Sequence, residues 1–126
     1  MKARSSLSAA LLLFIATPAL AEADWALVSS SGNGTNSIYV DRSSIRITGP
    51  IRRYWKRVDI VNNPKDWAKT MVLNEDNCAT GQNRVLQLTV YNVDGTNESR
   101  AVDGETWKYV PLGSVSKDVH DYVCRQ

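Results

Sequence analysis

The sequence predicts an α+β domain, an antiparallel meander sheet of about six strands with one C-terminal helix packed on it and tied by one disulfide. Three observations support this fold class. β-branched and aromatic stretches recur along the chain with Gly, Pro, Asn or Asp between them, which is typical of strands joined by tight turns. The final segment repeats its apolar residues at helical spacing instead. Cys78 and Cys124 can join that segment to the sheet.

Residues 1–21 have the features of a secretory signal peptide. A basic N-terminus precedes an apolar run from Leu7 to Leu20, and Ala19-Leu20-Ala21 offers small residues for cleavage. The run is short for a membrane span. We therefore expect cleavage after Ala21 and a single domain over residues 22–126 with no transmembrane anchor, located in the periplasm, at the cell surface or outside the cell. The alternative is an uncleaved, buried helix.

Removal of the signal peptide is expected to leave a domain without net charge. The whole chain carries a formal charge of +2, from 15 Lys and Arg against 13 Asp and Glu, and Lys2 and Arg4 account for the excess. Bulk nucleic-acid binding needs many cationic contacts with phosphates. We therefore expect no nucleic-acid partner.

Cys78 and Cys124 are the two cysteines of the chain. In an oxidising export compartment a lone pair of cysteines most simply forms one disulfide. A loop of this length would stabilise the fold by about 4 kcal/mol in the chain-entropy model. Metal ligation and a reactive thiol are the alternatives, but a metal would need more ligands and His120 is the sole histidine. We expect no metal and no cofactor.

The first half of the domain is expected to form a hairpin followed by a long strand. Residues 30–36 are rich in Ser, Gly and Asn, which suit tight turns. The stretch after Pro50 is rich in β-branched and aromatic residues and contains no Gly, Pro, Asn or Ser through Val61. Pro64 then stops the ladder, since proline has no N–H to donate. The strands expected here cover Trp25–Ser29, Ser37–Asp41 and Ile51–Val61.

The second half is expected to add further strands. Leu86, Leu88 and Val90 alternate with polar residues, so one face of their strand would be core and the other solvated. Asp94-Gly95 is a strong hairpin signal. The strands expected here cover Met71–Asn74, Arg84–Tyr91, Arg100–Val102 and Thr106–Val110.

The C-terminal helix is expected to begin after Ser114, which is a suitable N-cap. Val115, Val119, Tyr122 and Val123 then fall on one helical face, which would pack on the sheet. A disulfide from Cys124 would fix the end of this helix to the strand region.

The long strand contains the most charged local patch of the sequence. Its cationic residues flank Tyr54 and Trp55, and each exposed cation–π contact would contribute about 0.5–1 kcal/mol. Such a surface would suit an acidic partner, either a sulfated polysaccharide, an acidic protein loop or anionic lipid. The alternative is a solvated strand whose cationic stems cover apolar surface, because alternation divides the patch between two faces. The cationic residues are Arg52, Arg53, Lys56 and Arg57.

Trp67 is a second candidate for contact with a partner. Three of the four tryptophans lie in strand patterns and are expected in the core, whereas Trp67 follows Pro64 in a polar, loop-like stretch. An exposed aromatic anchor of this kind is enriched at interfaces. The candidate binding residues are therefore Arg52, Arg53, Trp55, Lys56, Arg57 and Trp67.

His120-Asp121 suggests acid–base chemistry only weakly. His120 follows Val119 by one position, so we expect an exposed histidine beside the apolar face of the helix. Cys124 is better explained by the disulfide. The sequence contains no phosphate-binding glycine loop, no two-histidine metal spacing and no nucleophile elbow. We therefore expect no catalytic site.

Several motifs occur in a characteristic order along nearly the whole domain. Tyr39-Val40-Asp41 with Ser44-Ile45 is similar to a Y-V-D-x-x-S-I stretch, and the segment from Trp107 to Ser114 is similar to W-x-x-V-x-P-G-S. In this order they resemble the motifs of the surface-adhesin protein E family of Gram-negative bacteria. Further matching residues are Trp25, Trp55, Cys78, Arg84, Val123 and Cys124. Leu112 departs from the pattern, as it separates Pro111 from Gly113.

The resemblance implies a sheet and helix joined by a Cys78–Cys124 bond, adhesion to host extracellular-matrix or serum proteins, and dimerisation. The expected function is thus that of an exported, non-catalytic binding domain. One alternative is a periplasmic structural or envelope-associated protein that contacts another envelope protein and has no host ligand. Another is a small-ligand carrier. The predicted cleavage site has no cysteine for lipid attachment.

Overall fold

The computed structural model describes residues 22–31, 33–62, 64–102 and 106–126, so the predicted signal peptide lies outside the described residues. The elements are strands β1 (Trp25–Ser30), β2 (Asn36–Asp41), β3 (Arg46–Thr48), β4 (Ile51–Ile60), β5 (Trp67–Asn77), β6 (Gln82–Asn92), β7 (Asn97–Ala101) and β8 (Lys108–Tyr109), a 3-10 turn η1 (Arg42–Ser44), and helix α1 (Val115–Cys124).

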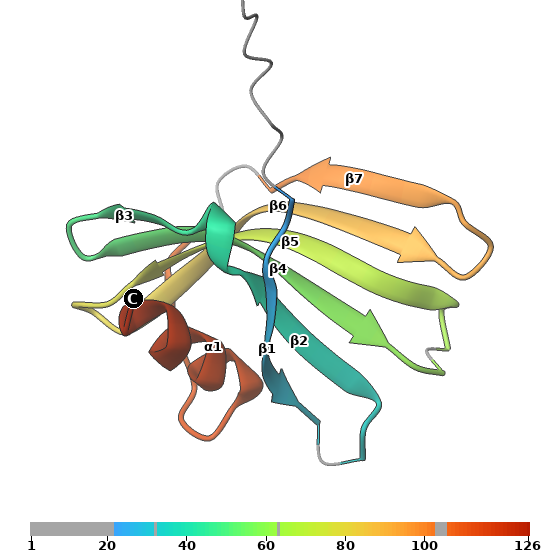
Figure 1. Cartoon of the computed structure of the whole chain (residues 1–126), viewed down its shortest axis with the longest axis horizontal. Helices are drawn as coiled ribbons and strands as arrows, with labels where there is room; N and C mark the ends of the chain where they lie inside the picture. The colour runs from blue at the N-terminus through green and yellow to red at the C-terminus, as the bar shows by residue number, and fades with distance from the viewer. Residues whose placement is uncertain (1–21, 32, 63, 103–105) are drawn as a thin grey trace, which may run out of the picture.

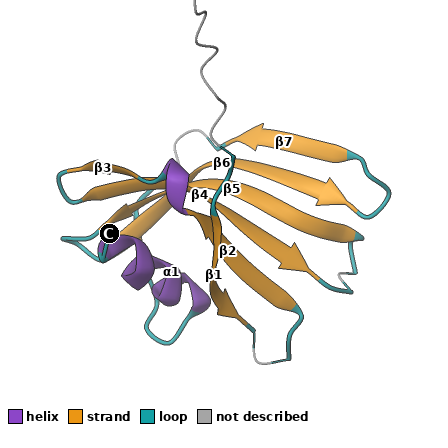
Figure 2. Cartoon of the chain, viewed as in Figure 1, coloured by secondary structure: helices purple, strands orange, loops and turns teal. Residues whose placement is uncertain are grey.

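The strands form one antiparallel sheet in which neighbours in sequence are mostly neighbours in space. The main path runs β1-β2-β4-β5-β6-β7, with β3 paired to β4 and β8 paired to β6. Figure 1 shows the sheet fanning out, with α1 lying near β1 and away from β7, and Figure 2 shows that α1 is its principal helix. The predicted α+β fold class is confirmed, with two short strands in addition to the six of the main path.

Several strand boundaries differ from those predicted, and the strand expected over Arg100–Val102 spans Asn97–Ala101. The strand expected to begin at Met71 begins at Trp67, because Asn62 and Asp66 both adopt left-handed backbone angles (φ 57° and 58°) and turn the chain sharply after β4. Asn and Asp tolerate this conformation better than other non-glycine residues. The last strand is limited to Lys108–Tyr109, since it pairs with β6 only over these residues.

The two faces of the sheet have different roles. On the helix face, Ile38, Val40 and Tyr54 are buried and form a cluster with Val119 and Val123 of α1. The opposite face, which we call the open face, carries Trp25, Tyr39, Trp55, Arg57 and Met71. Cross-strand pairing of Tyr39 with Arg57, and of Arg57 with Met71, aligns these side chains across β2, β4 and β5.

Helix α1 begins and ends as its sequence predicts. The hydroxyl of Ser114 accepts a hydrogen bond from the Lys117 amide at 3.1 Å, which satisfies one of the free N–H groups of the first turn. At the other end Cys124 is bonded to Cys78, with the two Cα atoms 5.7 Å apart. The predicted disulfide is therefore confirmed, and it fixes the end of α1 beside the end of β5.

Candidate functional site

The structure divides the predicted cationic patch between the two faces of β4. Arg53, Trp55 and Arg57 lie on the open face, because their cross-strand partners are Glu75, Leu73 and Met71. Arg52 and Lys56 lie on the helix face. The six candidate binding residues therefore do not form one surface, and any role in binding remains a prediction for each of them.

On the helix face, Arg52 and Lys56 contact other parts of the protein. The Nη1 atom of Arg52 donates a hydrogen bond to the carbonyl oxygen of Gly49 at 2.8 Å and so supports the β3–β4 turn. Lys56 lies in register between Val40 and Val72, which are both buried. Burial lowers the pKa of the Lys56 amine from its usual value, and the negative charge of Asp76 partly opposes this shift.

Trp67 is part of a small cavity and not an exposed loop anchor. It lines a space of about 100 Å³ together with Leu88, Val90 and Arg100. The amine of Lys65 lies 5.1 Å from the centroid of its ring. Trp67 begins β5, so its ring is half-buried against the sheet and lies apart from Trp55 on the open face. The prediction of a loop at this position was wrong.

The open face is organised around Arg57. Its guanidinium carbon lies 4.3 Å from the centroid of the Tyr39 ring and 5.0 Å from that of the Trp25 ring. The Nε atom of Arg57 is 2.9 Å from the carboxylate of Asp59, which keeps the guanidinium in place. Two rings from β1 and β2 are thereby held against a cation from β4, so this part of the surface is ordered before any partner binds.

An open depression of about 380 Å³ lies beside this stack. Its apolar and aromatic walls come from Trp25, Trp55, Met71 and Tyr91, which belong to four different strands. Asp41, Gln87 and Thr89 add polar residues to the lining. Half-buried aromatic rings beside a few polar groups can contact both apolar and hydrogen-bonding parts of a partner.

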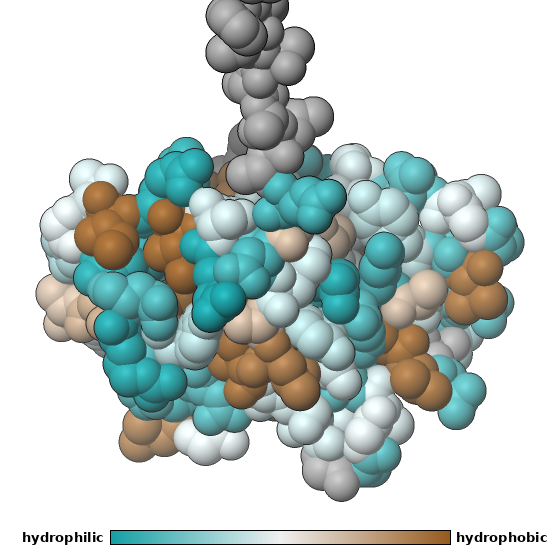
Figure 3. Space-filling view, in the orientation of Figure 1, coloured by the Kyte–Doolittle hydropathy of each residue, from teal (hydrophilic) through white to brown (hydrophobic). Residues whose placement is uncertain are grey.

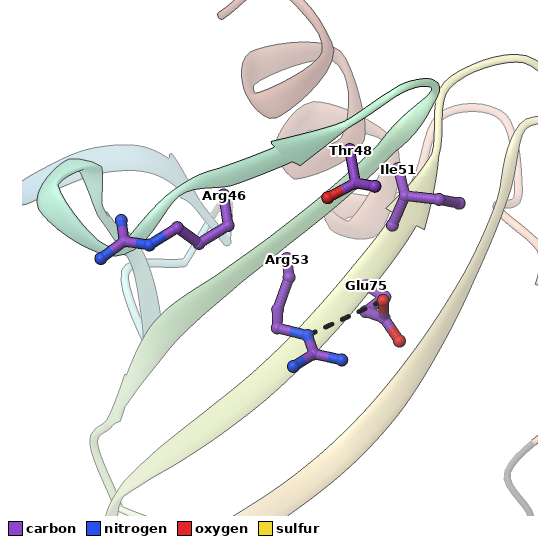
Figure 4. A pocket seen from close by; sticks show the side chains of 5 residues that line it. All are labelled: Arg46, Thr48, Ile51, Arg53 and Glu75. Carbon is purple, nitrogen blue, oxygen red and sulfur yellow. Dashed lines mark ion pairs between the residues drawn. The ribbon is translucent and has the colours of Figure 1, made fainter.

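A second depression of about 380 Å³ lies at the β3–β4 hairpin, with Arg46 and Arg53 among its lining residues. Figure 4 shows Arg53 and Glu75 on the near face of the sheet, with α1 behind it. Arg46, Arg53, Glu75 and Arg84 are directly opposite one another across β3, β4, β5 and β6, and we call this set the arginine row.

The anion of the arginine row is largely neutralised by one cation. Glu75 is buried, and its Oε1 atom accepts hydrogen bonds from Nε and Nη2 of Arg84 at 3.1 and 2.9 Å. The same guanidinium lies 4.5 Å from the centroid of the Trp107 ring. The Nε atom of Arg53 approaches Glu75 only to 3.8 Å. Arg84 is thus held from two sides, whereas Arg53 is left more free.

A buried polar network lies on the other side of the sheet, beneath α1. The fully buried Asp76 accepts hydrogen bonds at Oδ1 from the Tyr54 hydroxyl and from Asn74 Nδ2, each at 2.7 Å, and its Oδ2 atom lies 2.7 Å from His120 Nδ1. Burial, together with the charge of Asp76, raises the pKa of Tyr54 well above its usual value, so this hydroxyl remains a neutral donor.

His120 is therefore buried, and the prediction of an exposed histidine was wrong. Only 5% of its surface is accessible. Its side chain points from α1 toward the sheet, where Asp76 supplies a hydrogen-bond partner. The network is enclosed and its polar atoms face one another, which is the arrangement of a structural link between helix and sheet. Among the described residues no group of three or more His, Cys, Asp or Glu side chains could hold a metal ion.

Comparison with known proteins decides the family. The family model for surface-adhesin protein E matches residues 25–125, which is nearly all of the described chain. The chain belongs to the surface-adhesin protein E family. No curated protein sequence matches it. In the part of this family member that the structure describes, no helix is both long enough and apolar enough to cross a membrane.

Two solved structures of Haemophilus influenzae protein E have the same fold. Crystal form II of that protein aligns with a TM-score of 0.59 at 13% identity, covering 79% of this chain and 87% of the other. The protein E of non-typeable Haemophilus influenzae aligns with a TM-score of 0.53 at 12% identity, covering 79% and 75%. At these identities the similarity shows a shared fold.

Sequence reasoning missed part of the open face of this protein E relative. The strand patterns predict Trp25, Trp55 and Trp107 in the core, but all three are half-buried and lie outside the core cluster. Local patterns also do not identify Arg46 and Arg84 as companions of Arg53. The alternation along β4 was a usable signal, since it already placed Arg53, Trp55 and Arg57 on one side. Assigning the other strands to that side required the pairing register, which no local pattern contains.

Proposed function

We propose that this protein is an exported, non-catalytic binding domain that attaches to host extracellular-matrix or serum proteins through the open face of its sheet. The observation that carries the proposal is the depression formed by Trp25, Trp55, Met71 and Tyr91 beside the Arg57 stack. Tryptophan, tyrosine and arginine contribute most of the binding energy at many protein interfaces. Membership of the adhesin family supports the same reading.

The shape of the open face favours a protein partner over a small ligand. Ligand sites usually enclose most of their ligand, whereas this depression is broadly open to solvent. On the side of the molecule that carries α1, Figure 3 shows the apolar residues as separate patches among hydrophilic ones. Rings held in place by Arg57 would lose little freedom on binding, which reduces the entropic cost of association.

The alternative is an envelope protein of the periplasm that uses the same face to contact another envelope protein. Association of two copies belongs to this proposal as well, because β1 and β7 end the main path of the sheet and strands at an edge can pair with further strands. Protease treatment of intact cells separates the locations. Digestion of the protein on intact cells would support a location at the cell surface. Resistance to the protease until the outer membrane is permeabilised would support a location in the periplasm.

The direct test uses the mature domain on a panel of purified matrix and serum proteins, measured by surface plasmon resonance. We expect at least one partner, and we expect Trp55→Ala to weaken its binding at least tenfold. Leu112→Ala is the control, because Leu112 is an exposed apolar residue outside the open face. Circular dichroism verifies that both variants fold. Equal binding by both variants would contradict the role of the open face.

A further inference from the structure

The arginine row contains more positive charge than the described residues neutralise. It has three guanidinium groups and one carboxylate, and the carboxylate of Glu75 is engaged by Arg84 through two hydrogen bonds. The side chain of Arg53 is 54% exposed and its closest approach to Glu75 is 3.8 Å. Arg46 has no ion-pair partner among the described residues, and its Nη1 atom donates to the carbonyl oxygens of Ser43 and Ile45 at 3.1 and 3.3 Å.

The position of Arg46 opposite Arg53 is itself unfavourable. The two residues form a cross-strand pair in the β3–β4 hairpin. Like charges that face each other across a ladder destabilise the sheet, whereas an anion between them removes the repulsion and gains two cationic partners. Figure 4 shows the two guanidinium groups pointing apart, with Arg46 directed toward η1 and Arg53 toward Glu75. The space between them belongs to the depression of about 380 Å³ that also includes Thr48 and Ile51.

We propose that this depression is a carboxylate subsite, in which an acidic side chain of a protein partner binds between Arg46 and Arg53. The proposal rests on the proposed function, since it names the chemistry of the partner at one end of the open face. Guanidinium groups bind carboxylates through two parallel hydrogen bonds, which gives direction as well as attraction. The Thr48 hydroxyl is a further donor in the lining.

The buried carboxylate of Glu75 does not prevent this binding. Its charge is compensated by Arg84, which the Trp107 ring holds in place at 4.5 Å. Glu75 also attracts Arg53 to the edge of the depression, which keeps that guanidinium near the incoming acid. The subsite therefore has a fixed internal ion pair behind two more accessible cations.

The surroundings favour an acidic peptide segment over a polyanion such as a sulfated polysaccharide. Binding of a polyanion depends on many cations along a chain, and the domain without its predicted signal peptide has no net positive charge. The cationic excess is confined to one row, and Ile51 and the aromatic depression of the open face lie close to it on the same side of the sheet. This mixture suits a peptide in which an acidic residue is flanked by apolar residues.

The test uses two labelled peptides with the mature domain, one with Glu alternating with Leu and one with Gln in place of Glu. We expect the Glu peptide to bind at least tenfold more tightly in fluorescence anisotropy. Arg46→Gln and Arg53→Gln should each weaken binding at least fivefold. Arg100→Gln is the matched control, because Arg100 is an exposed arginine of β7 outside the depression, and it should leave binding unchanged. The Nε–Hε NMR signals of Arg46 and Arg53 should shift during the titration.

Three results would overturn the subsite. They are equal binding of the Glu and Gln peptides, NMR shifts confined to other residues, and displacement of the peptide by a heparin fragment that binds more tightly than the peptide. The proposed function is tested separately, because Trp55→Ala reports on the open face with any protein partner. If Trp55→Ala abolishes binding to a partner and Arg53→Gln does not, the carboxylate subsite is refuted and the binding function stands.

Discussion

His120 Nδ1 lies 2.7 Å from Asp76 Oδ2 and connects the last turns of α1 to β5 through the interior of the protein. The pair lies close to the Cys78–Cys124 bond, as Cys124 Sγ is 3.6 Å from the other ring nitrogen of His120. The helix is thus attached to the sheet by a covalent bond and by a buried polar link, in addition to its small apolar cluster. These two attachments give separate predictions.

Asp76→Ala is expected to lower the free energy of unfolding by about 3 kcal/mol. It removes the buried carboxylate that Tyr54, Asn74 and His120 share as a hydrogen-bond partner. Urea unfolding measures the change. Asp121→Ala is the control, since its exposed pair with Lys117 is screened by solvent and contributes little to stability. A loss of stability no greater than that of the control would show that the network contributes nothing.

Replacement of both Cys78 and Cys124 by Ala is expected to lower the free energy of unfolding by about 4 kcal/mol in the chain-entropy model. For a domain of this size the melting temperature should fall by about 15 °C or more. Thermal unfolding followed by circular dichroism measures the difference. The wild-type protein treated with a reducing agent should show the same fall, and an unchanged melting temperature in both experiments would refute the stabilising role of the bond.

Lys56→Met is expected to stabilise the protein at neutral pH and raise its melting temperature by a few degrees. Burial lowers the pKa of Lys56 in the folded state. Folding with a protonated Lys56 therefore costs free energy. The resulting cost is present below the lowered pKa and disappears as pH rises to the unfolded value of about 10.5. The advantage of the Met variant should therefore shrink toward that pH. A gain independent of pH would point to packing instead.

Arg57→Gln is expected to reduce stability by about 1 kcal/mol, because it removes contacts with the Trp25 and Tyr39 rings. It should also weaken binding to any protein partner, since the rings would no longer be held in place. Tryptophan fluorescence, urea unfolding and partner affinity can be measured on the same sample. Arg100→Gln provides a comparison, as Arg100 pairs only with exposed Glu98 among the described residues.

The elements that could be predicted are those specified by local sequence. Val115, Val119 and Val123 mark the buried side of α1 by their spacing, and Ser114 marks its start. The disulfide could be predicted from the number of cysteines together with the predicted signal peptide. The residues that specify α1 lie within a few positions of one another. The two cysteines are far apart in sequence, but each has one favoured bonding partner.

The remaining features depend on contacts between distant residues. His120 is buried because Asp76, 44 positions away, supplies a hydrogen-bond partner. The arginine row depends on register, and an irregularity between Leu73 and Asn74 changes how β5 pairs with β6. A shift of one residue would move Arg84 to the other face. No periodicity within a single strand contains that information.

The most direct test of the open face is hydroxyl-radical footprinting of the domain with and without a bound protein partner. Oxidation of Trp25, Trp55 and Met71 should fall in the complex, because these side chains would be covered. Trp67 belongs to a different cavity and should be oxidised as before. Protection of Trp67 with no change at Trp55 and Met71 would contradict the account.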